Sequence, residues 1–148
     1  MAAPTASLHF TQEVFESLKE KDITWTDIEL KVGRGTFLPI KADKITDHKM
    51  HSEEFEITDQ SALELTKAID ENRKIIPIGT TSMRVLEFWG LYGKNKSFRG
   101  DCDLFIYPGF DFKVCDGIIT NFHQGNSTLI CLVAAFMGLD NIKSIYKI

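Results

Sequence analysis

The stretch from Ile75 to Phe88 constrains the fold more than any other part of this sequence. A short apolar run, Ile75-Ile76-Pro77-Ile78, leads directly into Gly79-Thr80-Thr81-Ser82, and a helical pattern begins there. An apolar run of this length that is bounded by turn residues is typical of a buried strand. The stretch therefore predicts a strand, a tight turn and the N-terminus of a helix. Such a helix end offers backbone N–H groups and a positive dipole end to a ligand.

Further patterns predict an α/β fold, a layered mixed sheet with flanking helices. Apolar and polar residues alternate in segments 28–32 and 54–57, which indicates half-buried strands. Because the first strands are joined without intervening helices, we expect some antiparallel pairing. Shorter runs predict further strands at 37–40, 104–107 and 118–120, with Pro39 confining the first of these to an edge.

Helical spacing and end signals predict the helices. The helices are expected at about 11–21, from 59 or 61 to about 69, from 80 to about 88, and at 128–137. Ser127 is a candidate cap for the last of these, and Gly138 is its stop signal. The segment 90–100 is rich in Gly, Lys and Asn, so we expect a loop there.

Composition fits one globular domain, residues 1–148, and excludes several classes of protein. With 43% hydrophobic and 26% charged residues, the chain is not a disordered one. Its longest apolar run, 129–137, is far shorter than the ~20 residues of a membrane span. The formal charge of −4 argues against strong nonspecific binding to nucleic acid.

The chain end and the cysteines favour a cytoplasmic location. Met1-Ala2-Ala3-Pro4-Thr5 lacks the basic and apolar regions of a secretory signal. Cys102, Cys115 and Cys131 are odd in number and lack CxxC spacing, so we expect reduced thiols.

The first candidate site is the predicted helix start after the 75–78 strand. Thr80, Thr81 and Ser82 supply hydroxyl groups, and Arg84 supplies a planar fork that suits a carboxylate. The spacing is not that of a phosphate-binding loop for nucleoside triphosphates. The alternative is a well-capped helix that binds nothing.

The second candidate site is the segment His48-Lys49-Met50-His51-Ser52-Glu53. Imidazole ordinarily titrates near neutrality, so His48 and His51 are candidate proton acceptors that Glu53 can orient. No further ligand at suitable spacing supports a metal site. The alternative is a polar surface loop.

The third candidate site follows the predicted 118–120 strand. Asn121 and His123 lie at the strand end, and Ser127 lies at the next helix start, an arrangement that binds ligands in α/β sheets. Alternatively, Asn121 bonds to backbone, His123 is exposed and Ser127 only caps its helix. A fourth, weaker candidate is the turn containing Gly33, Gly35 and Thr36, which either lets backbone approach a ligand or only permits positive φ.

Six segments, in this order, resemble the S-adenosylmethionine:tRNA ribosyltransferase-isomerase family of queuosine biosynthesis. They are Ala2-Ala3-Pro4-Thr5-Ala6-Ser7-Leu8-His9-Phe10-Thr11, Val32-Gly33-Arg34-Gly35-Thr36-Phe37, His48-Lys49-Met50-His51-Ser52-Glu53, Gly79-Thr80-Thr81-Ser82-Met83-Arg84-Val85-Leu86-Glu87, Asp103-Leu104-Phe105-Ile106-Tyr107-Pro108-Gly109 and Ile119-Thr120-Asn121-Phe122-His123. The resemblance covers essentially the whole chain.

The resemblance implies an activity on the anticodon of tRNA. Family members transfer and isomerise the ribosyl group of S-adenosylmethionine onto 7-aminomethyl-7-deazaguanine at the wobble position, which gives epoxyqueuosine and releases adenine and methionine. No metal or tightly bound cofactor and no membrane is implied. On these motifs His51, helped by Glu53 or His48, is expected to transfer the proton. The first candidate site is expected to hold the substrate, and Asn121, His123 and Ser127 to line the opposite wall.

The resemblance also implies that the chain is a C-terminal-half fragment of the catalytic domain, truncated at both ends and lacking the family's inserted β-barrel. Alternatives are therefore a non-catalytic remnant that binds S-adenosylmethionine or a nucleoside, or one subunit of a split enzyme whose second chain supplies the rest. Three positions depart from the family pattern. This chain has Ser7 where the family has Gly, Lys31 where it has His, and Gly125 where it has Pro.

Overall fold

The computed structural model describes residues 5–31, 33, 40, 44–93 and 96–146. Its sheet has three antiparallel strands in the order β1-β2-β3, with bounds Glu29–Lys31, Glu53–Ile57 and Phe98–Cys102. The helices are α1 Gln12–Glu20, α2 Asp59–Asp70, α3 Thr80–Tyr92, α4 Thr128–Met137 and α5 Leu139–Ile145, with 3-10 turns η1 Thr5–His9 and η3 Ile45–Asp47. The predicted α/β class is confirmed.

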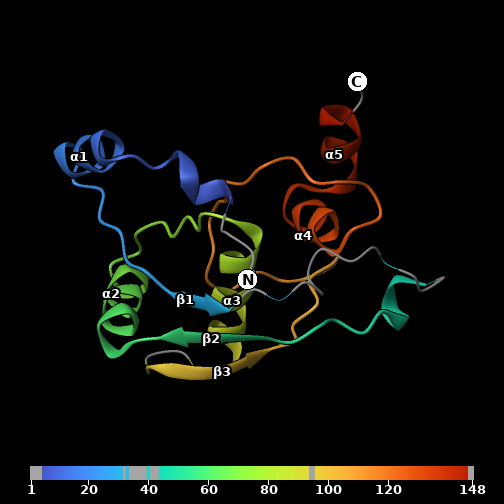
Figure 1. The fold of residues 1–148 in the computed structure, drawn as a ribbon, viewed down its shortest axis with the longest axis horizontal. Helices are drawn as coiled ribbons and strands as arrows, with labels where there is room; N and C mark the ends of the chain where they lie inside the picture. The colour runs from blue at the N-terminus through green and yellow to red at the C-terminus, as the bar shows by residue number, and fades with distance from the viewer. Residues whose placement is uncertain (1–4, 32, 34–39, 41–43, 94–95, 147–148) are drawn as a thin grey trace.

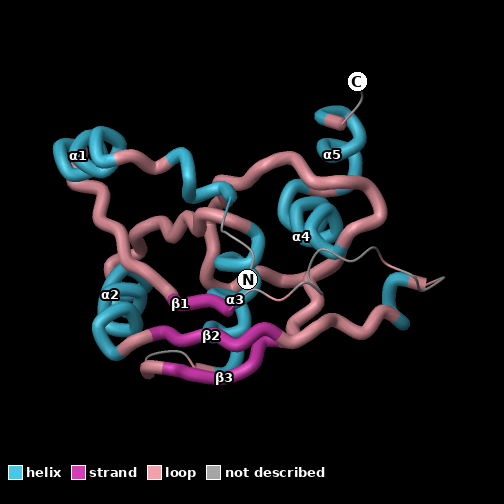
Figure 2. The backbone as a smooth tube through the Cα atoms, viewed as in Figure 1, coloured by secondary structure: helices cyan, strands magenta, loops and turns pink. Residues whose placement is uncertain are grey.

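The elements stack in a series that runs away from the sheet (Figure 1). Helix α3 contacts β3 on one side and α4 on the other, and α4 contacts α5. Long loops connect these layers, and Figure 2 shows the loop after β3 leading to the α4–α5 end of the molecule. The sheet and α5 therefore lie at opposite ends of the packed series.

The central strand β2 shows why the sheet packs as it does. Its side chains alternate between buried and partly exposed, so that Glu53, Phe55 and Ile57 face the core. The ring of Phe55 stacks on that of Phe98 at 5.5 Å between centroids. Burial of these aromatic side chains is the main stabilising contribution of this layer.

The opposite face of the sheet carries charged pairs between strands. Glu54 accepts hydrogen bonds from Lys31 at 2.8 Å and from Arg99 at 3.1 Å. Both cations lower the pKa of the Glu54 carboxyl. Lys31 is therefore part of a solvated cross-strand ion pair.

Strand β3 corrects the expectation of a loop throughout 90–100. It begins at Phe98, whose ring packs edge-on against Phe88 of α3 at 6.0 Å as well as stacking on Phe55. These contacts come from other elements, so local composition did not reveal them.

The segments around Ile78 and Ile119 were predicted as strands, and the structure reduces them to an isolated parallel bridge between these two residues. Gly79 N donates to Ile119 O at 2.8 Å, and Ile119 N donates to Pro77 O at 3.0 Å. The strand pairings of the sheet are antiparallel, so this bridge is the one parallel pairing among the described residues. The segment 104–107, also predicted as a strand, is irregular.

The helix ends follow the local signals. The Ser127 hydroxyl caps α4 by accepting a hydrogen bond from Ile130 N, as predicted. Gly138, at φ 88°, ends α4 and begins α5, a helix that the sequence patterns did not predict. Within the described part of the chain, no single helix is long and apolar enough to cross a membrane, although α4 and α5 together, bent by 114°, meet the length and composition of a span.

Candidate functional site

The Ile78–Ile119 bridge brings two of the predicted sites together. Helix α3 begins directly after Gly79, and the segment with Asn121 and His123 begins directly after Ile119. The hydrogen bond from Gly79 N to Ile119 O joins the two turns at their start. Two chain segments that are 40 residues apart in the sequence therefore lie side by side at this bridge.

The start of α3 is rich in hydroxyl groups and has no side-chain cap. Gly79 is the N-cap residue at φ 97°, a conformation that favours glycine. The hydroxyl oxygens of Thr81 and Ser82 lie near Gly79, each 3.9 Å from the place where a Cβ would stand. Thr80 is buried, whereas Thr81 and Ser82 are half-buried. The helix end thus combines a positive dipole with hydroxyl groups that a ligand can reach.

Arg84 and Glu53, which the sequence assigned to different sites, form one buried pair. Arg84 Nη2 donates to Glu53 Oε2, and the two side chains are only 4% and 1% exposed. Arg84 Nε and Nη1 are also buried and have no hydrogen-bond partner among the described residues. A buried guanidinium with two unpartnered nitrogens has the capacity to bind a further acceptor such as a carboxylate.

The two histidines of the second candidate site lie in different environments. The His48 ring packs edge-on against Phe105 at 5.0 Å, and its Nε2 is buried without a hydrogen-bond partner among the described residues. His51 is exposed, two residues before Glu53, which is buried. His51 is therefore accessible to a substrate from solvent, whereas His48 and Glu53 lie deeper.

The third candidate site is held by contacts from both ends of the chain. Asn121 Nδ2 donates to Thr5 Oγ1 at 3.0 Å, so the amide nitrogen bonds to a side chain of η1 and not to backbone, as the alternative interpretation had it. His123 N donates to the hydroxyl of Tyr146 at 2.9 Å, and its Nε2 lies 3.2 Å from Thr120 Oγ1. Burial lowers the pKa of His123, which favours the neutral imidazole.

Ser127 has its hydroxyl group engaged on both sides. It donates to Gln124 O at 2.8 Å and accepts from Ile130 N at 3.3 Å, and the residue is buried. The observed geometry is that of a helix cap. Of the glycine-rich turn, Gly33 is exposed, while Gly35 and Thr36 lie outside the described residues.

Glu87, a buried carboxylate of α3, was not singled out from the sequence as a site residue. Its oxygens accept hydrogen bonds from the backbone N–H groups of Lys113, Val114 and Cys115, at 2.7, 3.1 and 2.8 Å. The side chain therefore ties the loop after Gly109 to α3. An acidic residue in phase with the buried side of a helix is the signal that points to such a role.

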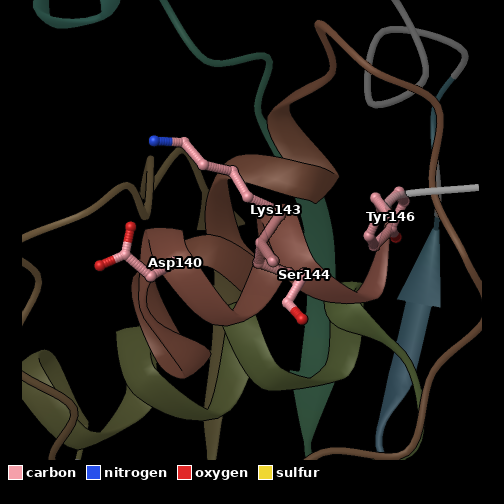
Figure 3. A pocket seen from close by; sticks show the side chains of 5 residues that line it. Asp140, Lys143, Ser144 and Tyr146 are labelled. Atoms are coloured by element: carbon pink, nitrogen blue, oxygen red, sulfur yellow. The ribbon is translucent and has the colours of Figure 1, made fainter.

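Two hollows lie at the α5 end of the molecule, and sequence reasoning found neither. The larger one, of about 530 Å³, opens on α5 itself, and Figure 3 shows Asp140, Lys143 and Ser144 projecting beside it, with Tyr146 at the helix end. The smaller one, of about 180 Å³, includes Thr120 and Asn121 among its lining residues. In the described part of the chain, no three His, Cys, Asp or Glu side chains gather as a metal site would need.

Comparison with known proteins relates the entire chain to one family. The family model described as "queuosine biosynthesis protein" matches residues 1–148. The curated S-adenosylmethionine:tRNA ribosyltransferase-isomerase of Dinoroseobacter shibae is 47% identical over 147 residues, which are 99% of this chain and 42% of that protein. The same-named protein of Carboxydothermus hydrogenoformans is also 47% identical over 147 residues, 44% of its length.

A solved structure shares the fold. The S-adenosylmethionine tRNA ribosyltransferase of Thermotoga maritima superimposes with a TM-score of 0.79 at 34% identity, over 96% of this chain and 44% of that one. The chain thus spans less than half the length of these relatives.

Proposed function

Because the chain belongs to the queuosine biosynthesis protein family, we propose that it supplies part of the active site of an S-adenosylmethionine:tRNA ribosyltransferase-isomerase. In this proposal the ribosyl group of S-adenosylmethionine is transferred to 7-aminomethyl-7-deazaguanine in the tRNA anticodon and isomerised, giving epoxyqueuosine, adenine and methionine. S-adenosylmethionine is a substrate, no tightly bound cofactor or metal takes part, and the reaction takes place in the cytoplasm.

The hydrogen bond from Gly79 N to Ile119 O is the observation that carries this proposal. It joins the hydroxyl-rich start of α3 to the segment with Asn121 and His123, and in this proposal the two segments form opposite walls of one substrate site. We assign the first wall, Thr80, Thr81 and Ser82, to the anionic and hydroxyl-bearing part of the substrate. We assign Asn121, His123 and Ser127 to the opposite wall. At the turn of Gly33, Gly35 and Thr36, we propose that the backbone approaches the substrate.

Arg84 is assigned to the methionyl carboxylate. Its Nη2 is engaged by Glu53, and its buried Nε and Nη1 are the donors that remain among the described contacts. A carboxylate that accepts from Nη1 supplies one of the missing acceptors, whereas Nε–H points to the Nη2 side of the guanidinium and needs a separate acceptor. This assignment requires a local opening, because the side chain is only 4% exposed.

His51 is assigned to proton transfer. The reaction removes a proton from a carbon next to the sulfonium, and an exposed imidazole is suited to accept it near neutral pH. Glu53 or His48 assists by orienting the segment that carries His51. His48 is half-buried and Glu53 is buried, so they are better placed to support His51 than to transfer the proton themselves.

A reconstituted assay tests the activity. The chain is incubated with S-adenosylmethionine and tRNA that carries 7-aminomethyl-7-deazaguanine, alone and with the parts of the Dinoroseobacter shibae relative outside the matched segment. Nucleoside mass spectrometry then detects epoxyqueuosine, and chromatography detects adenine. We expect turnover in the completed protein and a loss of about 10²-fold or more in His51→Ala. Lys49→Ala removes an exposed side chain from the same segment and serves as control.

The same assay separates the alternatives. Turnover only when the second polypeptide is present shows that activity needs the parts of the relative outside the matched segment, as a split enzyme would. Calorimetric binding of S-adenosylmethionine without turnover in either form identifies a non-catalytic remnant. Wild-type turnover in His51→Ala removes His51 from the mechanism.

A further inference from the structure

Phe122 is a large aromatic side chain that the fold leaves in solvent. It is 76% exposed, and none of the other large apolar residues described is more exposed. Its ring meets that of Tyr146 edge-on, at 5.3 Å between centroids and 75° between planes. An exposed ring face beside a second ring is the geometry on which planar heterocycles stack.

The smaller hollow adjoins these two rings. Its volume is about 180 Å³, and its lining combines apolar side chains of α4 and α5, such as Val133 and Ile142, with the polar residues Thr120 and Asn121. Binding sites for drug-sized ligands are roughly 300–1,000 Å³ in volume. The hollow therefore suits one heterocyclic base and not a whole nucleoside cofactor.

The segment that carries Phe122 is anchored on both sides. Asn121 is hydrogen-bonded to Thr5, and His123 N is hydrogen-bonded to the Tyr146 hydroxyl, the second ring of the pair. These bonds reduce the conformational freedom that binding would otherwise remove. The exposed ring is thus presented in a fixed position, and Asn121 retains an amide oxygen that can accept a hydrogen bond from an exocyclic amino group.

We propose that Phe122, Tyr146 and the adjoining hollow form a stacking site for a purine-like base. The inference rests on the proposed function, because that reaction supplies two such bases, the adenine of S-adenosylmethionine and the 7-deazaguanine of tRNA. Both present a flat π-face and an exocyclic amino group. Phe122 follows the Ile78–Ile119 bridge by three residues, and Asn121, which we assign to the opposite wall, also lines the hollow of the stacking site.

Calorimetric titration of the 148-residue chain tests the stacking site. The probes are adenosine, 7-aminomethyl-7-deazaguanine and, as a base-free control, ribose. We expect saturable binding of at least one purine-like probe and none of ribose. Phe122→Ala should weaken binding roughly 5- to 150-fold, the effect of losing one base–aromatic stack. Phe122→Tyr should retain binding, because it keeps the ring. Leu63→Ala, at a 65%-exposed residue of α2, is the matched surface control.

The outcomes distinguish the two sources of the base, and they also distinguish the stacking site from the proposed function. Preference for adenosine identifies the base of S-adenosylmethionine, and preference for the deazaguanine identifies the base of tRNA. Absence of saturable purine binding, or equal binding by wild type and Phe122→Ala, overturns the stacking site. Turnover in the completed protein without such binding leaves the proposed function intact, whereas Phe122-dependent binding without any turnover contradicts only the proposed function. Circular dichroism melting checks that each variant is folded.

Discussion

Glu53, at the start of β2, accepts a hydrogen bond from Arg84, in the second turn of α3, and both side chains are almost wholly buried. The two residues are 31 positions apart in the sequence. The pair joins the sheet to α3, the helix whose N-terminus we assign to the proposed substrate site. A buried charge that loses its partner is strongly destabilising, so this pair is also a test of the fold.

Removing one member of the pair should destabilise the protein by about 3–5 kcal/mol. We expect this for Glu53→Leu and for Arg84→Met, as measured by urea unfolding. The double variant Glu53→Leu/Arg84→Met should recover most of the loss, because it leaves no buried charge without a partner. Additive losses in the double variant would show that the two residues do not interact.

The exposed pair of Glu71 and Arg73 is the control for this cycle. Its side chains are 47% and 41% exposed, with Arg73 Nε 2.8 Å from Glu71 Oε2. Solvent screens such a pair, so Arg73→Met should change stability by less than about 1 kcal/mol.

Glu87→Gln should destabilise the loop after Gly109. The substitution places an amide N–H₂ where a carboxylate oxygen accepts a backbone N–H, and a buried donor without an acceptor costs about 1–3 kcal/mol. We expect a loss of that size in urea unfolding, and faster amide exchange at Lys113, Val114 and Cys115. Glu16→Gln, at an exposed residue of α1, should change neither measurement.

Two glycines with equal space should respond oppositely to alanine. A Cβ added at Gly125 or at Gly138 meets nothing within 4 Å, but only Gly138 has a positive φ, at 88°. Gly138→Ala should therefore lose about 1–3 kcal/mol through backbone strain. Gly125→Ala should gain about 0.4–1 kcal/mol, because alanine restricts the unfolded chain. Thermal unfolding measures both, and equal effects would contradict the assignment of strain to φ.

His123 should make stability depend on pH near neutrality. Burial lowers the pKa of His123 below its usual 6.5, so the unfolded chain binds a proton more readily than the folded one. This contribution is fully present above about pH 6.5 and is lost as the pH falls through that value toward the lowered pKa. Wild type should thus lose more stability than His123→Gln between pH 7.5 and 5.5. Equal pH profiles in urea unfolding would exclude His123 as the titrating group, and the exposed His9→Gln provides the reference.

Sequence patterns predicted the elements that depend on neighbouring residues. The turn and helix start at Gly79, the Ser127 cap and the Gly138 stop all follow from interactions within a few positions. The same patterns also indicated that Glu53 is buried, which an interpretation of its segment as a polar surface loop did not take into account. It is in phase with Phe55 and Ile57, and period 2 places all three on the buried face.

The sequence by itself determined the α/β class, most helix ends and the residues from which a site is built, because short-range hydrogen bonds and hydrophobic periodicity decide these features. Only the tertiary structure decided which of those residues meet. It paired Glu53 with Arg84, made a strand of Phe98–Cys102, and joined Asn121 to Thr5 across 116 positions. It also left the ring of Phe122 in solvent. Such contacts depend on which surfaces the packed layers bring together, and local propensity carries no information about distant partners.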